Sequence, residues 1–199
     1  MPRQTPTSRT ERELSRRAFF QSLASVVSGL VVSEAVLSRK VFGRSNETGS
    51  VVNVVRFSDA GERLNRVRTP KVVKTDAEWR QQLTPNEFDI TRRADTEMAF
   101  TGKYWNLHNA GLYRCVCCGN ALFDSKTKFD SGTGWPSFYA PIAPENVMSI
   151  HDDTFGMTRT AVACTECDAH LGHVFGDGPA PTHLRYCMNS VSLRFVPKA

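Results

Sequence analysis

The stretch over residues 164–190 holds a Cys-x-x-Cys pair, two histidines, a Gly/Pro-rich loop and one further cysteine. Two thiolates at this spacing can bind one tetrahedral ion from a single tight turn, but one pair supplies only half of a structural zinc site. A second Cys-x-x-Cys pair lies upstream and is followed by Gly119, which suits a sharply turning knuckle. The alternative is a pair of redox-active dithiols or disulfides. We favour a structural zinc site with four ligands: Cys115, Cys118, Cys164 and Cys167.

Cys187 lies in a run that has the composition of a strand, and the nearby Arg185 would favour its thiolate. A single cysteine in a strand is more often a small buried hydrophobic residue. However, His170 and His173 precede a glycine-rich turn, and a thiol accompanied by histidines is a candidate nucleophile with its proton donors. On spacing alone, both interpretations of Cys187 stay open.

The chain resembles the methionine-R-sulfoxide reductases of the B type in four motifs, in this order: CVCCGNALF, FDSGTGWPSF, CTECDAHLGHVFGDGP and RYCMNSVSLRF. The likeness covers about residues 72–196. It implies a mainly β fold of two packed antiparallel sheets with short N-terminal helices. It also implies a four-cysteine zinc site that joins two loops away from the chemistry, and a cysteine nucleophile.

The resemblance implies that Cys187 attacks the sulfoxide sulfur and becomes a sulfenic acid while methionine is released. His173 would bind the sulfoxide oxygen, and His170 would share the proton network with Asp177 as a partner. Asn189 lies two residues after the nucleophile and therefore on the same face of the strand.

The substrate pocket follows from the same resemblance. Trp135 would help to form an apolar pocket for the methyl group on the sulfoxide sulfur, and Phe175 would wall the cleft. Arg185 lies on the same strand face as Cys187 by the alternation of side chains. Without the resemblance, a tryptophan before a proline is more often a packing residue.

The implied partners are oxidised methionine residues in proteins or peptides and a thioredoxin-like or other thiol reductant. Many family members place a resolving cysteine where this chain has Thr133. The remaining free thiol, Cys117, lies between two proposed zinc ligands. We therefore expect an external thiol, rather than Cys117, to reduce the sulfenic acid of Cys187.

Two other classes of function compete with an enzyme. One is a zinc-stabilised binding module in which Cys187 is simply buried, and the other is a redox sensor that uses this thiol for signalling. The combination of His170, His173, Asn189 and Trp135 argues against both. Turnover of a methionine sulfoxide substrate would discriminate between them.

The net charge of +5 belongs to the N-terminal part of the chain. Residues 1–69 hold twelve Lys/Arg and six Asp/Glu, whereas residues 70–199 hold thirteen and fourteen. A nucleic-acid-binding domain needs a basic face on its folded part. The near-neutral remainder therefore argues against nucleic acid as a partner.

Arg16 and Arg17 precede an uncharged stretch at residues 21–32 that is too short and too rich in Ser and Gly for a clear membrane span. This arrangement resembles a twin-arginine export signal over residues 1–35, with cleavage near Ser33-Glu34-Ala35. The alternative is a membrane anchor. An export signal implies the bacterial periplasm or cell envelope, with membrane contact only during export.

Residues 36–69 show no sustained periodicity, so we expect a tether or loosely attached arm before a reductase domain over 70–199. We expect this domain to be a monomer. Thr75 and Glu78 form a capping box, and Thr84 and Glu87 form another, which predicts two consecutive helices at the start of the domain.

After residue 111, short runs of aromatic and β-branched residues alternate with Gly, Pro, Asp and Asn, a pattern typical of antiparallel sheets. We expect strands near 112–116, 121–123, 136–140, 147–151, 155–163, 172–175, 183–188 and 191–196.

Overall fold

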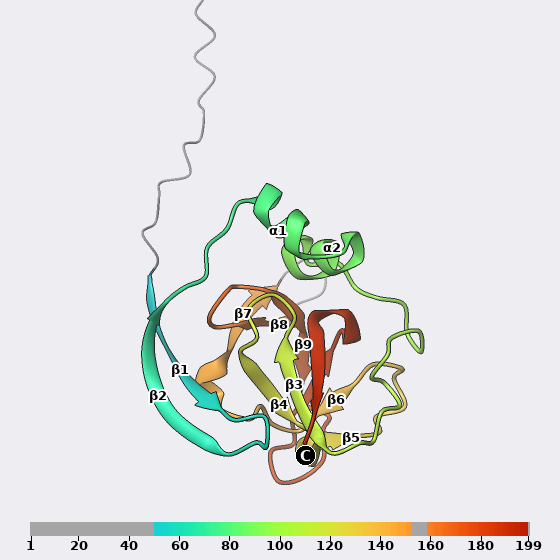
Figure 1. Cartoon of the computed structure of the whole chain (residues 1–199). Coiled ribbons are helices and arrows are strands. Elements are labelled where there is room, and N and C mark those ends of the chain that lie inside the picture. Colours follow the sequence, from blue (N-terminus) through green and yellow to red (C-terminus); the bar gives the residue numbers. More distant parts are fainter. Residues whose placement is uncertain (1–49, 153–158, 199) are drawn as a thin grey trace, which may run out of the picture. The chain divides into compact units, whose positions relative to one another are not determined.

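Three antiparallel sheets form the framework of the computed structural model, which describes residues 50–152 and 159–198 (Figure 1). The largest sheet has six strands in the order β5-β6-β10-β9-β8-β7, the second has the order β11-β3-β4, and β1 and β2 form a hairpin. The predicted export signal and the first part of the predicted tether lie outside the described residues. The strands are β1 (Val51–Phe57), β2 (Arg63–Pro70), β3 (Gly111–Cys115), β4 (Ala121–Asp124), β5 (Lys128–Phe129), β6 (Ser137–Phe138), β7 (Val147–Asp152), β8 (Arg159–Cys164), β9 (His170–Phe175), β10 (Arg185–Met188) and β11 (Leu193–Pro197).

The core lies where the six-stranded and three-stranded sheets face each other. Phe138 of β6 stacks on Phe123 of β4 with ring centroids 4.4 Å apart, and it meets Tyr113 of β3 edge-on at 4.9 Å. Leu171 of β9 and Met188 of β10 are fully buried in the same cluster. The prediction of a mainly β fold with packed antiparallel sheets is confirmed.

Two helices lie between the hairpin and the other two sheets along the chain, α1 (Asp76–Gln82) and α2 (Pro85–Arg93). Both predicted capping boxes are present: the Thr75 and Thr84 hydroxyls accept from the backbone N–H three residues on, and the Glu at that position bonds back to the cap N–H. Phe88 of α2 is fully buried, and α2 packs against β9. Among the described residues, no helix is long and apolar enough to cross a membrane.

The hairpin of β1 and β2 corrects the expectation of a loosely attached arm for residues 51–69. Val54 and Val55 of β1 are fully buried. The side chain of Asn146 donates to the Val55 carbonyl at 2.8 Å and accepts from the Val55 N–H at 2.7 Å, as a neighbouring strand would. The hairpin is thus part of the folded domain, because long-range contacts bury a segment whose own sequence is mixed and charged.

The predicted strands agree with the observed ones in order and type, and they differ at their ends. The strand expected over 136–140 is only two residues long, since β6 spans Ser137–Phe138. The strand expected over 155–163 is described as β8 from Arg159, and residues 153–158 lie outside the described part. Residues 190–192 form a 3-10 turn before β11, and β5 was not predicted.

Candidate active site and metal centre

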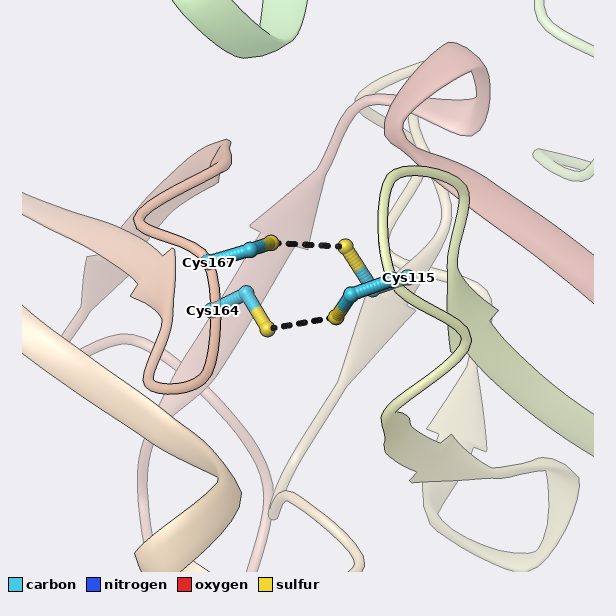
Figure 2. A group of neighbouring side chains, drawn as sticks. Cys115, Cys164 and Cys167 are labelled. Atoms are coloured by element: carbon cyan, nitrogen blue, oxygen red, sulfur yellow. Dashed lines mark hydrogen bonds between the residues drawn. The ribbon is translucent and has the colours of Figure 1, made fainter. Parts of the chain in front are cut away.

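Four thiols from two loops converge on one point, and Figure 2 shows Cys115, Cys164 and Cys167 among them. All four sulfurs, including that of Cys118, lie within 4.8 Å of one another. The Cys115–Cys167 and Cys118–Cys164 sulfur pairs are both 3.6 Å apart. A disulfide needs about 2.05 Å, whereas four sulfurs about 2.3 Å from a tetrahedral ion lie about 3.8 Å apart. The cluster therefore fits a metal ion.

The two knuckles that present these thiols have the same local geometry. Gly119 donates its N–H to the carbonyl of Cys115 at 2.8 Å, and Asp168 donates to the carbonyl of Cys164 at 2.9 Å. Gly119 and Asp168 both have positive φ, at 79° and 57°. Glycine takes this conformation without strain, and Asp is among the few other residues that tolerate it. The predicted knuckle at Gly119 is confirmed.

A cleft of about 130 Å³ surrounds Cys187. The structure brings most of the predicted site residues together in its lining. The lining consists of Thr96, Trp135, Arg159, Gly172, His173, Phe175, Cys187 and Asn189. His170 and Arg185 were also predicted for the site, but they do not line this cleft.

The pairing of β9 and β10 places the key side chains. Cys187 lies directly opposite His173, and Arg185 directly opposite Phe175. Side chains of directly opposed residues project from the same face of a sheet, and residues two apart on a strand share a face. The Arg185 guanidinium lies 4.4 Å above the Phe175 ring, so this pair forms a wall beside Cys187.

Asp177 binds Arg185 and not a histidine, which corrects the expectation that it joins the proton network. Its two carboxylate oxygens accept from Nε and Nη2 of Arg185, both at 2.8 Å. This pairing lowers the pKa of Asp177. Asp177 follows the end of β9, and from there it reaches the start of β10.

Asp152, at the end of β7, is the carboxylate that contacts His173, and sequence reasoning missed it. Its Oδ2 atom lies 2.9 Å from Nε2 of His173 and accepts from Nη2 of Arg159 at 3.1 Å. Asp152 is far from the histidines in sequence, and it belongs to no motif. Only the order β9-β8-β7 in the sheet brings its carboxylate to His173.

A β-bulge brings His170 beside His173 although the two are three residues apart. β8 residues Val162 and Ala163 pair with Gly172 and His170, which leaves Leu171 as an extra residue in β9. The imidazole rings meet edge-on with centroids 5.3 Å apart. Burial, with the nearby His173, lowers the pKa of His170 to about 4. His170 is therefore a neutral imidazole at pH 7.

Gly172 allows β9 and β10 to approach each other closely at this bulge. Its φ is 153°, and a Cβ atom added there would lie 2.2 Å from the carbonyl oxygen of Cys187. Any side chain would push β10, and with it Cys187, away from His173. Gly172 thus allows the close approach of β9 and β10 that places Cys187 beside His173.

Burial raises the pKa of the Cys187 thiol above its ordinary value, although hydroxyls and Arg185 oppose this effect. The Thr133 hydroxyl lies 3.8 Å from the sulfur and 2.8 Å from the Ser131 hydroxyl. Ser131 in turn lies 2.8 Å from the Ser137 hydroxyl. The predicted influence of Arg185 is present, but desolvation outweighs it in the free protein.

Glu97 is a second residue that sequence reasoning missed. Its backbone N–H donates to Oδ1 of Asn189 at 3.1 Å, and its carbonyl accepts from Nε1 of Trp135 at 3.1 Å. Its carboxylate accepts from the N–H groups of Ser190 and Val191 at 2.6 and 3.0 Å. One buried residue thereby fixes the orientation of two side chains of the cleft. It lies outside the motifs that identified the rest of the site.

Comparison with known proteins shows which family the chain matches. The model of the SelR domain matches residues 83–197. A protein of Herminiimonas arsenicoxydans named peptide methionine sulfoxide reductase MsrB is 59% identical over 127 residues, which are 64% of this chain and 93% of the relative. Proteins of the same name from Synechococcus sp. (strain RCC307) and Agrobacterium fabrum are 53% and 52% identical over 135 and 134 residues. These alignments cover 68% and 67% of this chain and 99% of each relative.

Proposed function

The chain belongs to the SelR domain family, and we propose that it reduces methionine-R-sulfoxide in proteins or peptides to methionine at the cleft around Cys187. Relatives that are 52–59% identical and bear the name peptide methionine sulfoxide reductase support an oxidoreductase that acts on methionine sulfoxide. The observation that carries the proposal at this site is the cross-strand pair of Cys187 and His173 inside a small cleft lined by Trp135 and Phe175.

The proposed reaction moves one oxygen atom and two electrons. The sulfur of Cys187 attacks the sulfoxide sulfur and forms a bond to it, while the sulfoxide oxygen gains protons. The sulfur–oxygen bond then breaks and the protonated oxygen leaves as water. A water molecule attacks the Cys187 sulfur, the bond between the two sulfurs breaks with its electron pair on the methionine sulfur, and methionine leaves while the Cys187 sulfur ends oxidised as a sulfenic acid. The Cys187 thiol and the sulfenic acid each carry one proton. The conversion of one to the other with reduction of the sulfoxide therefore consumes no net proton.

The proton network of this reaction is assigned from the contacts. His173 faces Cys187 across the strand pair and is hydrogen-bonded to Asp152, so we assign it to bind and protonate the sulfoxide oxygen. His170 packs against His173 and orients it. The Asn189 amide, fixed by Glu97, borders the same cleft and can contact the substrate.

Burial of Cys187 has a consequence for the proposed step. Because desolvation raises the pKa of the thiol, the free enzyme holds mostly the protonated form near pH 7. The proton of Cys187 has to leave as the substrate oxygen gains one. The hydroxyl of Thr133 and the guanidinium of Arg185 favour the thiolate at that moment.

We propose that the metal ion is zinc, held by Cys115, Cys118, Cys164 and Cys167. A site with four thiolate ligands has no open position, so a bound zinc ion supplies stability and no catalytic water. The expected result for Cys115→Ser is loss of bound zinc and impaired folding. Metal analysis that finds no zinc in folded, active protein would refute this assignment.

We further propose that the protein is exported by the twin-arginine pathway and repairs oxidised proteins in the bacterial periplasm or cell envelope, as a monomer. The proposal rests on Arg16-Arg17 and the uncharged stretch after them. A thioredoxin-like or other thiol reductant would return the Cys187 sulfenic acid to the thiol.

Turnover with dithiothreitol and each epimer of N-acetyl-methionine sulfoxide tests the central proposal. The R epimer should be consumed and the S epimer should not. Cys187→Ser should abolish turnover with fold and metal content unchanged, because an alcohol cannot replace the thiolate at the sulfur. Consumption of neither epimer by the wild-type protein would reject the function.

A further inference from the structure

Two large apolar side chains beside the cleft are strongly exposed. Met98 is 76% exposed and Phe100 is 56% exposed. They follow Glu97, whose carbonyl oxygen accepts the hydrogen bond from Nε1 of Trp135. Neither Met98 nor Phe100 lines the cleft around Cys187. They therefore form an apolar surface next to the reaction centre but outside it.

Phe100 has an unusual backbone conformation for its size. The N–H of Thr101 bonds to the carbonyl of Met98 and closes a turn, with Phe100 at its third position and a φ of 65°. Glycine or asparagine normally occupies this position of a turn that requires positive φ. A bulky residue in such a conformation is an outlier, and it persists only where the surroundings hold it there.

The surroundings of Phe100 hold its ring in position. Its N–H donates to the carbonyl of Gly134 at 2.8 Å, in the loop that carries Trp135. The ring of Trp105 meets the Phe100 ring edge-on, with centroids 5.4 Å apart. Gly134 has no room for a side chain, because a Cβ atom there would lie 2.7 Å from the Phe100 ring. Thus the exposed ring is fixed beside the Trp135 loop.

The surface next to these residues is hollow. A groove of about 630 Å³ is lined by residues that include Met98, Lys103 and Tyr104, and it shares the exposed Thr96 with the cleft. The cleft itself, with about 130 Å³, has room for a single side chain. When that side chain belongs to a polypeptide, the residues on either side of it must lie on the surface around the cleft.

We propose that Met98 and Phe100 form a docking surface for the polypeptide segment that flanks the methionine sulfoxide, with a preference for apolar neighbours. This inference rests on the proposed function and names its substrate class: oxidised methionines in extended, apolar segments of polypeptides. The continuity of the groove with the cleft at Thr96 is what favours a substrate segment as the occupant.

The test compares substrates of different size with dithiothreitol as the reductant, and a second series replaces dithiothreitol with thioredoxin. The substrates are N-acetyl-methionine-R-sulfoxide, an unstructured peptide with methionine-R-sulfoxide between leucines, and a matched peptide with serines. The variants are Met98→Ala and Phe100→Gly, and glycine keeps the positive φ without strain. Leu64→Ala, a 59% exposed residue of β2, is the matched control. Circular dichroism checks the fold of each variant.

The wild-type protein should prefer the leucine peptide over the serine peptide. Each docking variant should raise KM for the leucine peptide about fivefold to tenfold, on the scale of losing one partly buried apolar side chain, and remove the preference. KM for N-acetyl-methionine-R-sulfoxide should stay within about twofold, as should all values for Leu64→Ala.

Three outcomes would overturn the docking surface. Equal increases of KM for all three substrates would show that the residues only support the cleft. Unchanged KM for the peptide would show that the substrate segment lies elsewhere, and an effect seen only when thioredoxin replaces dithiothreitol would assign the surface to the reductant. A wild-type protein that turns over the small substrate keeps the proposed function in every one of these cases.

Discussion

Nε2 of His173 lies 2.9 Å from Oδ2 of Asp152, although the two residues belong to different, non-adjacent strands of the six-stranded sheet. An ionised carboxylate only accepts hydrogen bonds, so Nε2 of His173 carries the proton in this pair. In the proposed reaction, the other ring nitrogen is then the one that can exchange a proton with the substrate. Asp152 therefore determines which tautomer of His173 is present.

We expect Asp152→Asn to reduce the single-turnover rate by about tenfold to a hundredfold, because an amide can donate to Nε2 and stabilise the wrong tautomer. Asp177→Asn is the comparison, since Asp177 binds Arg185 and no histidine. It should change the rate less than about threefold. If rapid-quench measurements showed a larger loss of rate for Asp177→Asn than for Asp152→Asn, Asp177 rather than Asp152 would belong to the proton network.

Arg56 of the hairpin and Glu166 of the metal knuckle form a second long-range contact. Two hydrogen bonds of 2.6 and 2.7 Å join them, and the Glu166 side chain is only 7% exposed. The N–H of Val72 donates to the Glu166 carbonyl at 2.8 Å. These contacts thus hold the segment between Cys164 and Cys167 in place. The hairpin that contributes Arg56 precedes the residues that match the SelR domain.

Arg56→Met should therefore destabilise the domain by about 2 kcal/mol, because it leaves a buried carboxylate without its partner while Arg56 itself is partly solvated. Metal release to a chelator should become faster. Urea unfolding and a colorimetric chelator assay measure the two effects. Arg66→Met removes an exposed arginine 4.0 Å from Glu145 and should leave both values unchanged.

His170 makes stability depend on pH. The buried imidazole has a pKa of about 4, below its ordinary value of 6.5, and the titratable groups near it are His173, Asp152 and Arg159. Between these values the unfolded chain binds a proton that the folded one does not, so stability falls as the pH is lowered from about 6.5 to about 4. The difference between the two pKa values corresponds to a loss of about 3 kcal/mol in the free energy of unfolding.

Thermal unfolding of the wild-type protein and of His170→Gln, followed from pH 7 to pH 4.5, isolates this contribution. The variant should be less stable at pH 7 and should lose less stability on acidification. His108→Gln removes an exposed histidine and should keep the pH dependence of the wild type. Parallel curves for wild type and His170→Gln would assign the acid sensitivity to other groups.

Glu97 makes a testable link between stability and catalysis. We expect Glu97→Gln to place an amide NH₂ against one of the N–H groups that the carboxylate binds, and to cost about 1–2 kcal/mol. Because Glu97 also fixes Asn189 and Trp135, kcat/KM for N-acetyl-methionine-R-sulfoxide should fall about tenfold. Glu78→Gln disturbs the capping box of α1 and should lower stability without changing kcat/KM. Equal kcat/KM in the two variants would leave Glu97 with a structural role only.

Local signals in the sequence predicted the parts of this protein that depend on local geometry. The capping boxes at Thr75 and Thr84, the Cys-x-x-Cys knuckles and the positions of eight strands after residue 111 all follow from spacing and turn residues. Asp152 and Glu97 could not be found this way, because each reaches its partners through contacts between segments far apart in the chain. The alternation of residues in a strand predicts which face of the sheet a side chain lies on, but it does not predict which strand lies next to it in the sheet.

The hairpin and the bulge were missed for related reasons. Val54 and Val55 are adjacent in β1 and both buried, so residues 51–57 lack the alternation that identifies a strand. The extra residue Leu171 breaks the alternation in β9 and turns His170 toward His173. The resemblance to a family supplied the role of Trp135, which its own context would have assigned to packing.

Recycling of the oxidised enzyme gives the last prediction. Thr133 lies 3.8 Å from the sulfur of Cys187, at the position where many family members have a resolving cysteine. Cys117 is 5% exposed, donates to Oγ1 of Thr91 in α2, and does not line the cleft. A disulfide requires Cα atoms within about 7 Å. An external thiol is therefore expected to reduce the Cys187 sulfenic acid directly.

One equivalent of substrate added to reduced protein should give a sulfenic acid at Cys187 that dimedone traps, as mapped by mass spectrometry. Cys117→Ser should recycle with dithiothreitol at the wild-type rate. Thr133→Cys should instead form a disulfide with Cys187 after one turnover, because its sulfur would take the place of the hydroxyl beside the Cys187 sulfur. A Cys117–Cys187 disulfide that forms as fast as turnover, together with loss of recycling in Cys117→Ser, would contradict direct reduction.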